Sequence, residues 1–143
     1  MSLIKSNDQI ARMRDSCAIA AAVLVKLKSL VRPGITTQDL DEAGRDIMAE
    51  YGARSADFGY QIGSRRYPAH TCISVNEEVV HGVPSLRRIL HDGDIVSLDV
   101  TVEYKGYIGD NAITIPVGAI HPQLDKLLRV TDESLAVGIR QAT

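Results

Sequence analysis

The chain has 143 residues, 45% of them hydrophobic and 24% charged, a balance typical of a folded globular domain that excludes a disordered chain. Its net charge of −2 excludes a nucleic-acid partner held mainly by attraction to phosphates. The longest apolar run, Ala18 to Val25, is far shorter than the roughly 20 residues that cross a bilayer, so we expect no membrane contact. Two cysteines, Cys17 and Cys72, are too few for a disulfide framework, and we expect both to be buried thiols in a cytoplasmic protein.

The first third of the chain predicts two helices. Apolar residues recur at helical spacing after Asn7 or Asp8, either of which can cap a helix. A second amphipathic segment begins at Thr36 or Thr37, and Gly52 terminates it.

The periodicity is lost between residues 53 and 68, which predicts a long surface loop, a kind of segment that is often functional. Residues 72–76 are β-branched and alternating, which predicts a short strand, and residues 79–84 predict a sharp turn. Near the C-terminus, Pro122 suits the first turn of a further amphipathic helix.

The clearest pattern is a predicted β-hairpin. Residues 95–104 alternate between apolar and polar side chains, Lys105-Gly106 predicts a two-residue turn, and residues 107–117 predict the returning strand. This turn fixes the register, because a shift by one residue would move every apolar side chain to the other face.

In that register Val96 faces Ile115 and one face of the hairpin is largely apolar. Thr101 then faces Asp110, so Asp99 and Asp110 are diagonal neighbours on the other face, with Cα atoms roughly 7–8 Å apart. Carboxylates this close repel each other, and a divalent cation between them is one interpretation. The alternative is that both are solvated on an exposed face, because two aspartates at this spacing are a weakly specific pattern.

His81 lies in a short loop between a predicted strand and Pro84, a place from which side chains commonly project into a cleft. It is a candidate general acid, substrate ligand or metal ligand. The alternative is a surface or packed histidine in a turn.

Two segments together resemble the signature of the type I methionine aminopeptidases. The first is residues 67–84, and the second is residues 93–102 followed by residues 106–110. They occur in the expected order and at the expected separation, and the resemblance covers essentially the whole chain. Because several matches coincide, the resemblance favours the functional interpretation of the two aspartates and the histidine.

The resemblance implies an α/β (α+β) fold that is half of a pita-bread fold, with an antiparallel sheet and helices packed on one face. Residues 1–143 would form the N-terminal half of a catalytic domain. The complete enzyme would hold two divalent metal ions (cobalt, manganese, iron, zinc or nickel), with Asp99 binding one ion and Asp110 bridging both.

The resemblance also implies roles for residues that bind the substrate. His81 would contact the substrate near the metals and assist proton transfer. Tyr67 and Cys72 would line the pocket for the methionine side chain, and Tyr60 is a further substrate-binding candidate.

The implied activity is metal-dependent removal of N-terminal methionine from a peptide or nascent protein. The remaining ligands of the family, one histidine and two glutamates, belong to a second half, so we expect a partial or empty metal site and no activity from this chain alone. An uncovered apolar sheet surface would favour self-association. The alternatives are a half-length, non-catalytic binding module and a prolidase-like peptidase, against which the context of residues 81–84 argues.

Overall fold

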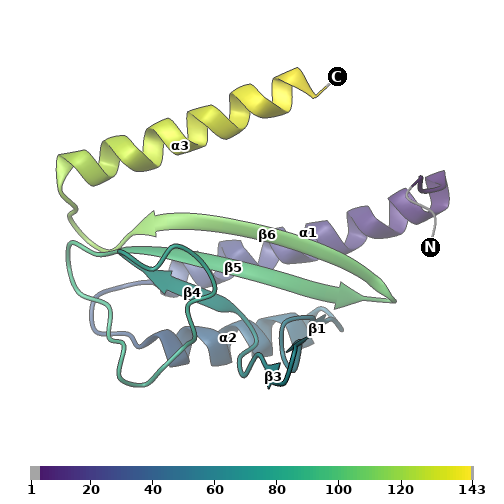
Figure 1. The fold of residues 1–143 in the computed structure, drawn as a ribbon, viewed down its shortest axis with the longest axis horizontal. Helices are drawn as coiled ribbons and strands as arrows, with labels where there is room; N and C mark the ends of the chain where they lie inside the picture. The colour runs from purple at the N-terminus through teal and green to yellow at the C-terminus, as the bar shows by residue number, and fades with distance from the viewer. Residues whose placement is uncertain (1–3, 143) are drawn as a thin grey trace.

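An antiparallel sheet forms the centre of the chain in the computed structural model, which describes residues 4–142 (Figure 1). Residues 1–3 of the N-terminal segment and Thr143 lie outside the described part. In chain order the elements are α1 (Asn7–Leu30), α2 (Thr37–Glu50), β1 (Arg54–Ser55), β2 (Gln61–Ile62), β3 (Arg65–Arg66), β4 (Cys72–Val75), β5 (Ile95–Tyr104), β6 (Tyr107–Pro116) and α3 (Pro122–Gln141).

Both N-terminal helices begin with a capping box. In α1 the cap is Ser6, which precedes both predicted candidates, Asn7 and Asp8. The Ser6 hydroxyl accepts from the Gln9 backbone N–H at 3.3 Å, and the Gln9 side chain accepts from the Ser6 N–H at 2.9 Å. In α2 the predicted Thr36 is the cap, and it exchanges the equivalent two hydrogen bonds with Asp39. These side chains satisfy backbone donors that a helix cannot pair by itself.

The predicted hairpin register is confirmed. Strands β5 and β6 pair along ten residues, from Ile95 opposite Pro116 to Tyr104 opposite Tyr107. Lys105 and Gly106 connect them with φ angles of 50° and 81°, the left-handed conformation at both positions that a type I′ turn requires.

On its other edge β5 pairs with two short strands, one after the other along its length. Strand β4 pairs with residues 96–99 of β5, with Cys72 opposite Asp99, and β1 pairs with residues 102 and 103. The prediction of an unbroken loop over residues 53–68 is therefore wrong in part, since this segment contains β1 and the β2–β3 hairpin. Strands of two residues are too short to show an alternating pattern in the sequence.

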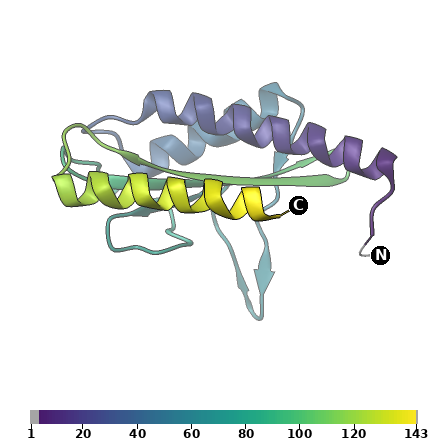
Figure 2. The same cartoon turned by 90° about the horizontal axis from the view of Figure 1, so that it is seen from above.

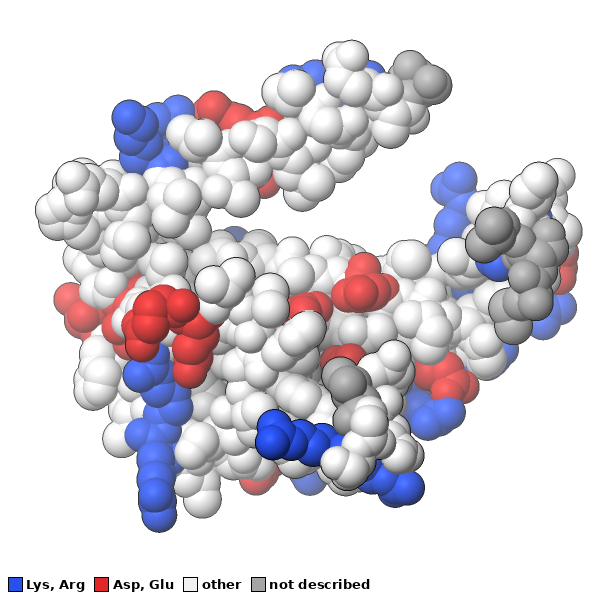
Figure 3. Space-filling view, in the orientation of Figure 1, with Lys and Arg blue, Asp and Glu red and all other residues white. Residues whose placement is uncertain are grey.

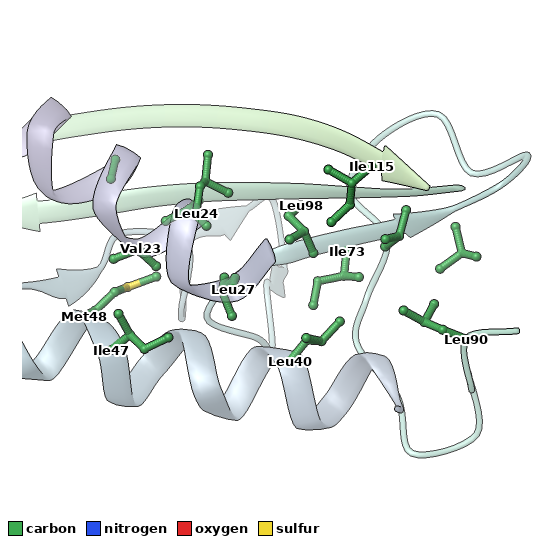
Figure 4. Packing of buried hydrophobic residues seen from close by; sticks show 14 of the residues in the cluster. Val23, Leu24, Leu27, Leu40, Ile47, Met48, Ile73, Leu90, Leu98 and Ile115 are labelled. Atoms are coloured by element: carbon green, nitrogen blue, oxygen red, sulfur yellow. The ribbon is translucent and has the colours of Figure 1, made fainter. Parts of the chain in front are cut away.

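Helices α1 and α2 cover the apolar face of the sheet, as expected for half of a pita-bread fold (Figure 4). Apolar side chains of β5, such as Leu98, and of the two helices, such as Leu27 and Leu40, are fully buried between these layers. At one point α1 comes so close that a Cβ on Gly109 of β6 would stand 2.3 Å from the backbone of Ser16. The Ser16 hydroxyl also donates to the Tyr107 carbonyl at 3.0 Å.

The expectation that both cysteines are buried is wrong for Cys17. Its thiol is exposed on α1, whereas Cys72 is buried in β4. The buried stripe of α1 begins at Ser16, which faces β6, and continues through Ala20, so Cys17 points away from the sheet.

Helix α3 is arranged differently from α1 and α2. It runs beyond the outer strand β6 and stands apart from the sheet (Figures 1 and 2), and none of its described residues is buried. Three of its apolar side chains, Leu127, Leu135 and Ile139, are more than half exposed. The uncovered apolar surface is thus on α3 rather than on the sheet, whose apolar face is buried. No helix in the described residues is long and apolar enough to span a membrane.

Candidate metal and substrate site

The polar face of the hairpin brings the two predicted metal ligands together. Asp99 on β5 is half-buried, and Asp110 on β6 lies opposite Thr101, so both carboxylates project from the same face. Burial raises the pKa of Asp99, and the charge of Asp110 raises it further, while the nearby His81 lowers it. Within residues 4–142 neither carboxylate forms an ion pair with a lysine or arginine.

Backbone contacts hold His81 beside these carboxylates. The following residue, Gly82, accepts from the Ile73 N–H at 2.9 Å and donates to the Ser74 hydroxyl at 3.0 Å. A Cβ on Gly82 would lie 2.2 Å from the Ile73 carbonyl oxygen, so only glycine permits this approach. His81 itself has φ of 58°, an uncommon conformation for a residue other than glycine, and its side chain is exposed.

Tyr67 and Cys72 form a neutral wall next to Asp99. The Tyr67 hydroxyl has one proton, which it shares between the Gly82 carbonyl at 3.0 Å and the Thr71 carbonyl at 3.2 Å. Burial raises the pKa of Tyr67, and burial also raises the pKa of the Cys72 thiol to about 11. Both groups therefore stay uncharged at neutral pH, which suits contact with an apolar side chain.

A buried carboxylate on α2 anchors the segment that leads into β4. Asp41 is 3% exposed and accepts from the backbone N–H groups of His70 and Thr71 at 2.9 and 2.8 Å and from the Thr71 hydroxyl at 2.8 Å. These hydrogen bonds fix the start of β4, and with it the position of Cys72 opposite Asp99.

All six site residues named from the sequence line one pocket of about 750 Å³. They are Tyr60, Tyr67, Cys72, His81, Asp99 and Asp110. Tyr60 is 62% exposed at the base of the β2–β3 hairpin, where its carbonyl accepts from the Tyr67 N–H at 2.8 Å. The hairpin therefore places the two tyrosines side by side.

Asp57 lines the same pocket and was not among the residues predicted from the sequence. It follows β1, where the Ala56 N–H donates to the Thr101 carbonyl at 2.9 Å. Burial raises the pKa of Asp57 to about 6 against a lowering effect of the nearby Thr101, and the charges of Asp99 and Asp110 raise it further. The one available signal was that Asp57 sits in a segment predicted to be a functional loop.

A second hollow, of about 620 Å³, lies between the polar face of the sheet and α3. His81 and Asp99 line both hollows. In Figure 3 the gap beneath α3 is open, and acidic side chains gather on the sheet below it. The polar face of the sheet is thus continuous with the hollow beneath α3.

The geometry fits divalent ions in part. Two short carboxylates on paired, rigid strands offer the oxygen ligands that such ions bind, and a cation between them would relieve the repulsion between Asp99 and Asp110. Within residues 4–142, however, no three His, Cys, Asp or Glu side chains converge closely enough to hold an ion by themselves. These residues can therefore supply only part of a ligand set.

Comparison with known proteins identifies the class as a metallopeptidase. The profile of metallopeptidase family M24 matches residues 11–143, and the chain belongs to this family.

Similar relatives within the family are methionine aminopeptidases. The one from Clostridium acetobutylicum is 40% identical over 142 residues, which are 99% of this chain and 55% of that protein. The crystal structure of the methionine aminopeptidase from Thermotoga maritima matches with a TM-score of 0.87 at 36% identity, over 93% of this chain and 52% of that one. Aminopeptidase P from Escherichia coli matches with a TM-score of 0.81 at 26% identity, over 96% of this chain and 29% of that one.

These matches confirm the resemblance to methionine aminopeptidases and the half pita-bread fold. The chain spans about half the length of the curated relatives it matches.

Proposed function

We propose that residues 1–143 form the N-terminal half of a catalytic domain that removes N-terminal methionine from nascent proteins in the cytoplasm with the help of divalent metal ions. The observation that carries this proposal is the convergence of Asp99 and Asp110 on the pocket that Tyr67 and Cys72 also line. The similarity to methionine aminopeptidases supports the choice of substrate.

Asp99 and Asp110 would hold the ions. When bound, divalent ions would polarise a peptide carbonyl and activate water for hydrolysis. Strand pairing fixes both carboxylates without any movement of a loop, because each lies in the middle of a ten-residue strand. Cobalt, manganese, iron, zinc and nickel all remain candidates.

His81 would act on the substrate. Its side chain stands at the rim of the pocket, beside Asp99, where it can donate a hydrogen bond to the oxygen of the first peptide carbonyl as negative charge develops there. Tyr67 and Cys72, both neutral, would pack against the methionine thioether.

The solved structures also include peptidases of another specificity, such as aminopeptidase P. The prolidase-like alternative stays a hypothesis, and so does the non-catalytic binding module. Hydrolysis of peptides beginning Met-Ala, compared with peptides that have proline in the second position, separates the prolidase-like alternative from the proposal. Absence of metal binding would favour the non-catalytic binding module.

The test is peptide hydrolysis by two forms of the protein, residues 1–143 alone and a form that continues through a second half. With manganese or cobalt we expect the longer form to release methionine from Met-Ala peptides and the short form to be inactive. Asp110→Asn should lower the rate by at least about a hundredfold, because one of the carboxylates that would hold the ions is lost. Full activity of the Asp110→Asn protein would contradict the proposal, and Asp46→Asn on the exposed side of α2 is the matched control.

A further inference from the structure

The backbone at His81 adopts a conformation that histidine does not favour. Its φ angle of 58° lies in the left-handed region, which glycine enters freely and a residue with a side chain enters at a cost in free energy. Such a conformation persists only where neighbouring contacts hold it, and it is concentrated at functional sites. The contacts around His81 therefore decide whether its side chain stands at the pocket.

The residues that precede His81 do not supply these contacts. Val79 and Val80 are 86% and 62% exposed, so packing does not fix this part of the loop. His81 is itself exposed at the rim of the pocket. The constraint on its backbone must therefore come from the residue that follows, Gly82.

Gly82 is hydrogen-bonded through both of its backbone groups. Its carbonyl accepts from the Ile73 N–H at 2.9 Å and from the Tyr67 hydroxyl at 3.0 Å, so the loss of either donor leaves the carbonyl paired. Its N–H donates to the Ser74 hydroxyl at 3.0 Å, which is its one acceptor among residues 4–142. That N–H belongs to the peptide group that joins His81 to Gly82, so Ser74 holds the group attached directly to the His81 Cα atom.

The position of Ser74 suits this task and excludes a main role in binding substrate. Ser74 lies on β4 opposite Ser97 of β5, on the same face of the sheet as Cys72 and Asp99. It is 4% exposed, so its hydroxyl has little access to a ligand. Without this acceptor a partly buried N–H would be left unpaired, which costs more than an average hydrogen bond contributes.

We propose that Ser74 is a positioning residue, whose hydroxyl holds the peptide group between His81 and Gly82 and thereby the left-handed conformation that places the His81 side chain at the pocket. This rests on the proposed function, in which His81 donates a hydrogen bond to the first peptide carbonyl. Ser74 acts through the backbone of the loop and does not touch the substrate.

The experiment compares Ser74→Ala with two matched variants of the full chain. Ser74→Thr keeps a hydroxyl at the same position. Ser97→Ala removes a hydroxyl from the residue directly opposite on β5, where it contacts Thr114 at 2.7 Å instead of the loop. If the role of Ser74 were merely to support the sheet, both alanine variants should affect His81 alike.

The first readout is the conformation of His81, measured by NMR on the metal-free chain in a chelator. In the left-handed conformation the amide and α protons of a residue lie closer together than at negative φ, so the nuclear Overhauser cross-peak between them is stronger. Lys105, with φ of 50° in the distant β5–β6 turn, provides an internal reference. The ratio of the His81 cross-peak to the Lys105 cross-peak therefore reports how much of the loop is held.

We expect this ratio to fall by at least about a third in Ser74→Ala, because the loss of one hydrogen bond shifts the equilibrium between held and released loops by up to about tenfold. Ser74→Thr and Ser97→Ala should keep the wild-type ratio. Tyr67→Phe, which removes the other hydroxyl bound to Gly82 and retains the aromatic ring, should change the ratio less than Ser74→Ala, since the Gly82 carbonyl keeps the Ile73 N–H.

The second readout is kinetic and uses the longer form that continues through a second half. Ser74→Ala should lower kcat on Met-Ala peptides by about five- to tenfold and leave KM within about twofold, because His81 would stabilise charge that develops only in the transition state. Ser74→Thr should restore kcat.

The proposal is overturned if the His81 ratio in Ser74→Ala stays within about a tenth of the wild type, since the hydrogen bond would then not hold the loop. An equal fall in Ser97→Ala, a larger fall in Tyr67→Phe, or an unchanged kcat in Ser74→Ala would overturn it as well. The NMR readout depends on neither metal nor hydrolysis. Failure of this inference is thereby distinguished from failure of the proposed function, which full activity of Asp110→Asn would reveal.

Discussion

The two faces of β5 differ although they belong to the same ten residues. On one face Val96, Leu98, Val100 and Val102 have no exposed surface and pack under α1 and α2. On the other face the side chains that alternate with them are half-buried around an open, acidic pocket. The packing of the apolar face thus determines the fold. It also fixes the register between β5 and β6, and this register positions the side chains of the polar face.

The largest expected effect is on the packed face. Leu98→Ala should lower the free energy of unfolding by about 2–5 kcal/mol, because it leaves a cavity in a fully buried position. Ser97→Ala is the matched change on the other face, where a hydroxyl contact of 2.7 Å with Thr114 is lost, and should cost about 1 kcal/mol or less. Chemical denaturation of both variants measures the difference, and equal losses would contradict the asymmetry between the faces.

A smaller effect is expected where α1 meets β6. Gly109→Ala places a methyl group 2.3 Å from the Ser16 backbone, so α1 must move, at a cost of about 1–3 kcal/mol. Gly138→Ala in α3 meets nothing within 4 Å and should instead stabilise the chain by about 0.5–1 kcal/mol through helix propensity. Thermal unfolding of the two variants should therefore shift in opposite directions, and a neutral Gly109→Ala would show that this contact is loose.

The smallest effect concerns the acidic face without metal. The pKa of Asp99 is raised in the folded chain, so the folded state binds more protons than the unfolded state. The contribution of Asp99 to stability is therefore fully present below pH 3.8 and is lost as the pH rises through its folded pKa. Asp99→Asn removes this loss and should stabilise the metal-free chain at pH 7, by less than about 1 kcal/mol because solvent screens a half-exposed group.

Thermal unfolding of wild type and Asp99→Asn at pH 7 in a chelator measures this effect. Addition of manganese should reverse the order, since an ion that binds only the folded wild type stabilises it. If the wild type stays less stable than Asp99→Asn with manganese present, Asp99 is not a ligand.

The contrast between the two faces also explains what the sequence could predict. The register followed from ten alternating residues and one Lys105-Gly106 turn, and it placed Asp99 and Asp110 correctly on one face. Strong periodicity and a specific turn constrain the chain locally, so one sequence suffices to find them.

The parts that escaped prediction depend on contacts distant in sequence. Asp57 reaches the pocket only because β1 pairs with β5, and a strand of two residues is too short for this pairing to be predicted from the sequence. The exposure of Cys17 depends on which residue of α1 faces β6, and there Ser16 takes the inner position through its hydrogen bond to the Tyr107 carbonyl. The separation of α3 from the sheet also could not be predicted from its amphipathic pattern. That pattern indicates that one side of the helix can pack against an apolar surface, but not which surface.

The most direct test of the central claim, that Asp99 and Asp110 together bind divalent cations, is a titration of the full chain with Mn²⁺ followed by NMR. Because a bound paramagnetic ion broadens signals near it, we expect the backbone signals of Asp99, Asp110 and His81 to disappear first, and to persist in the Asp99→Asn and Asp110→Asn variants. Broadening that begins elsewhere in the chain, or that both variants leave unchanged, would contradict the claim.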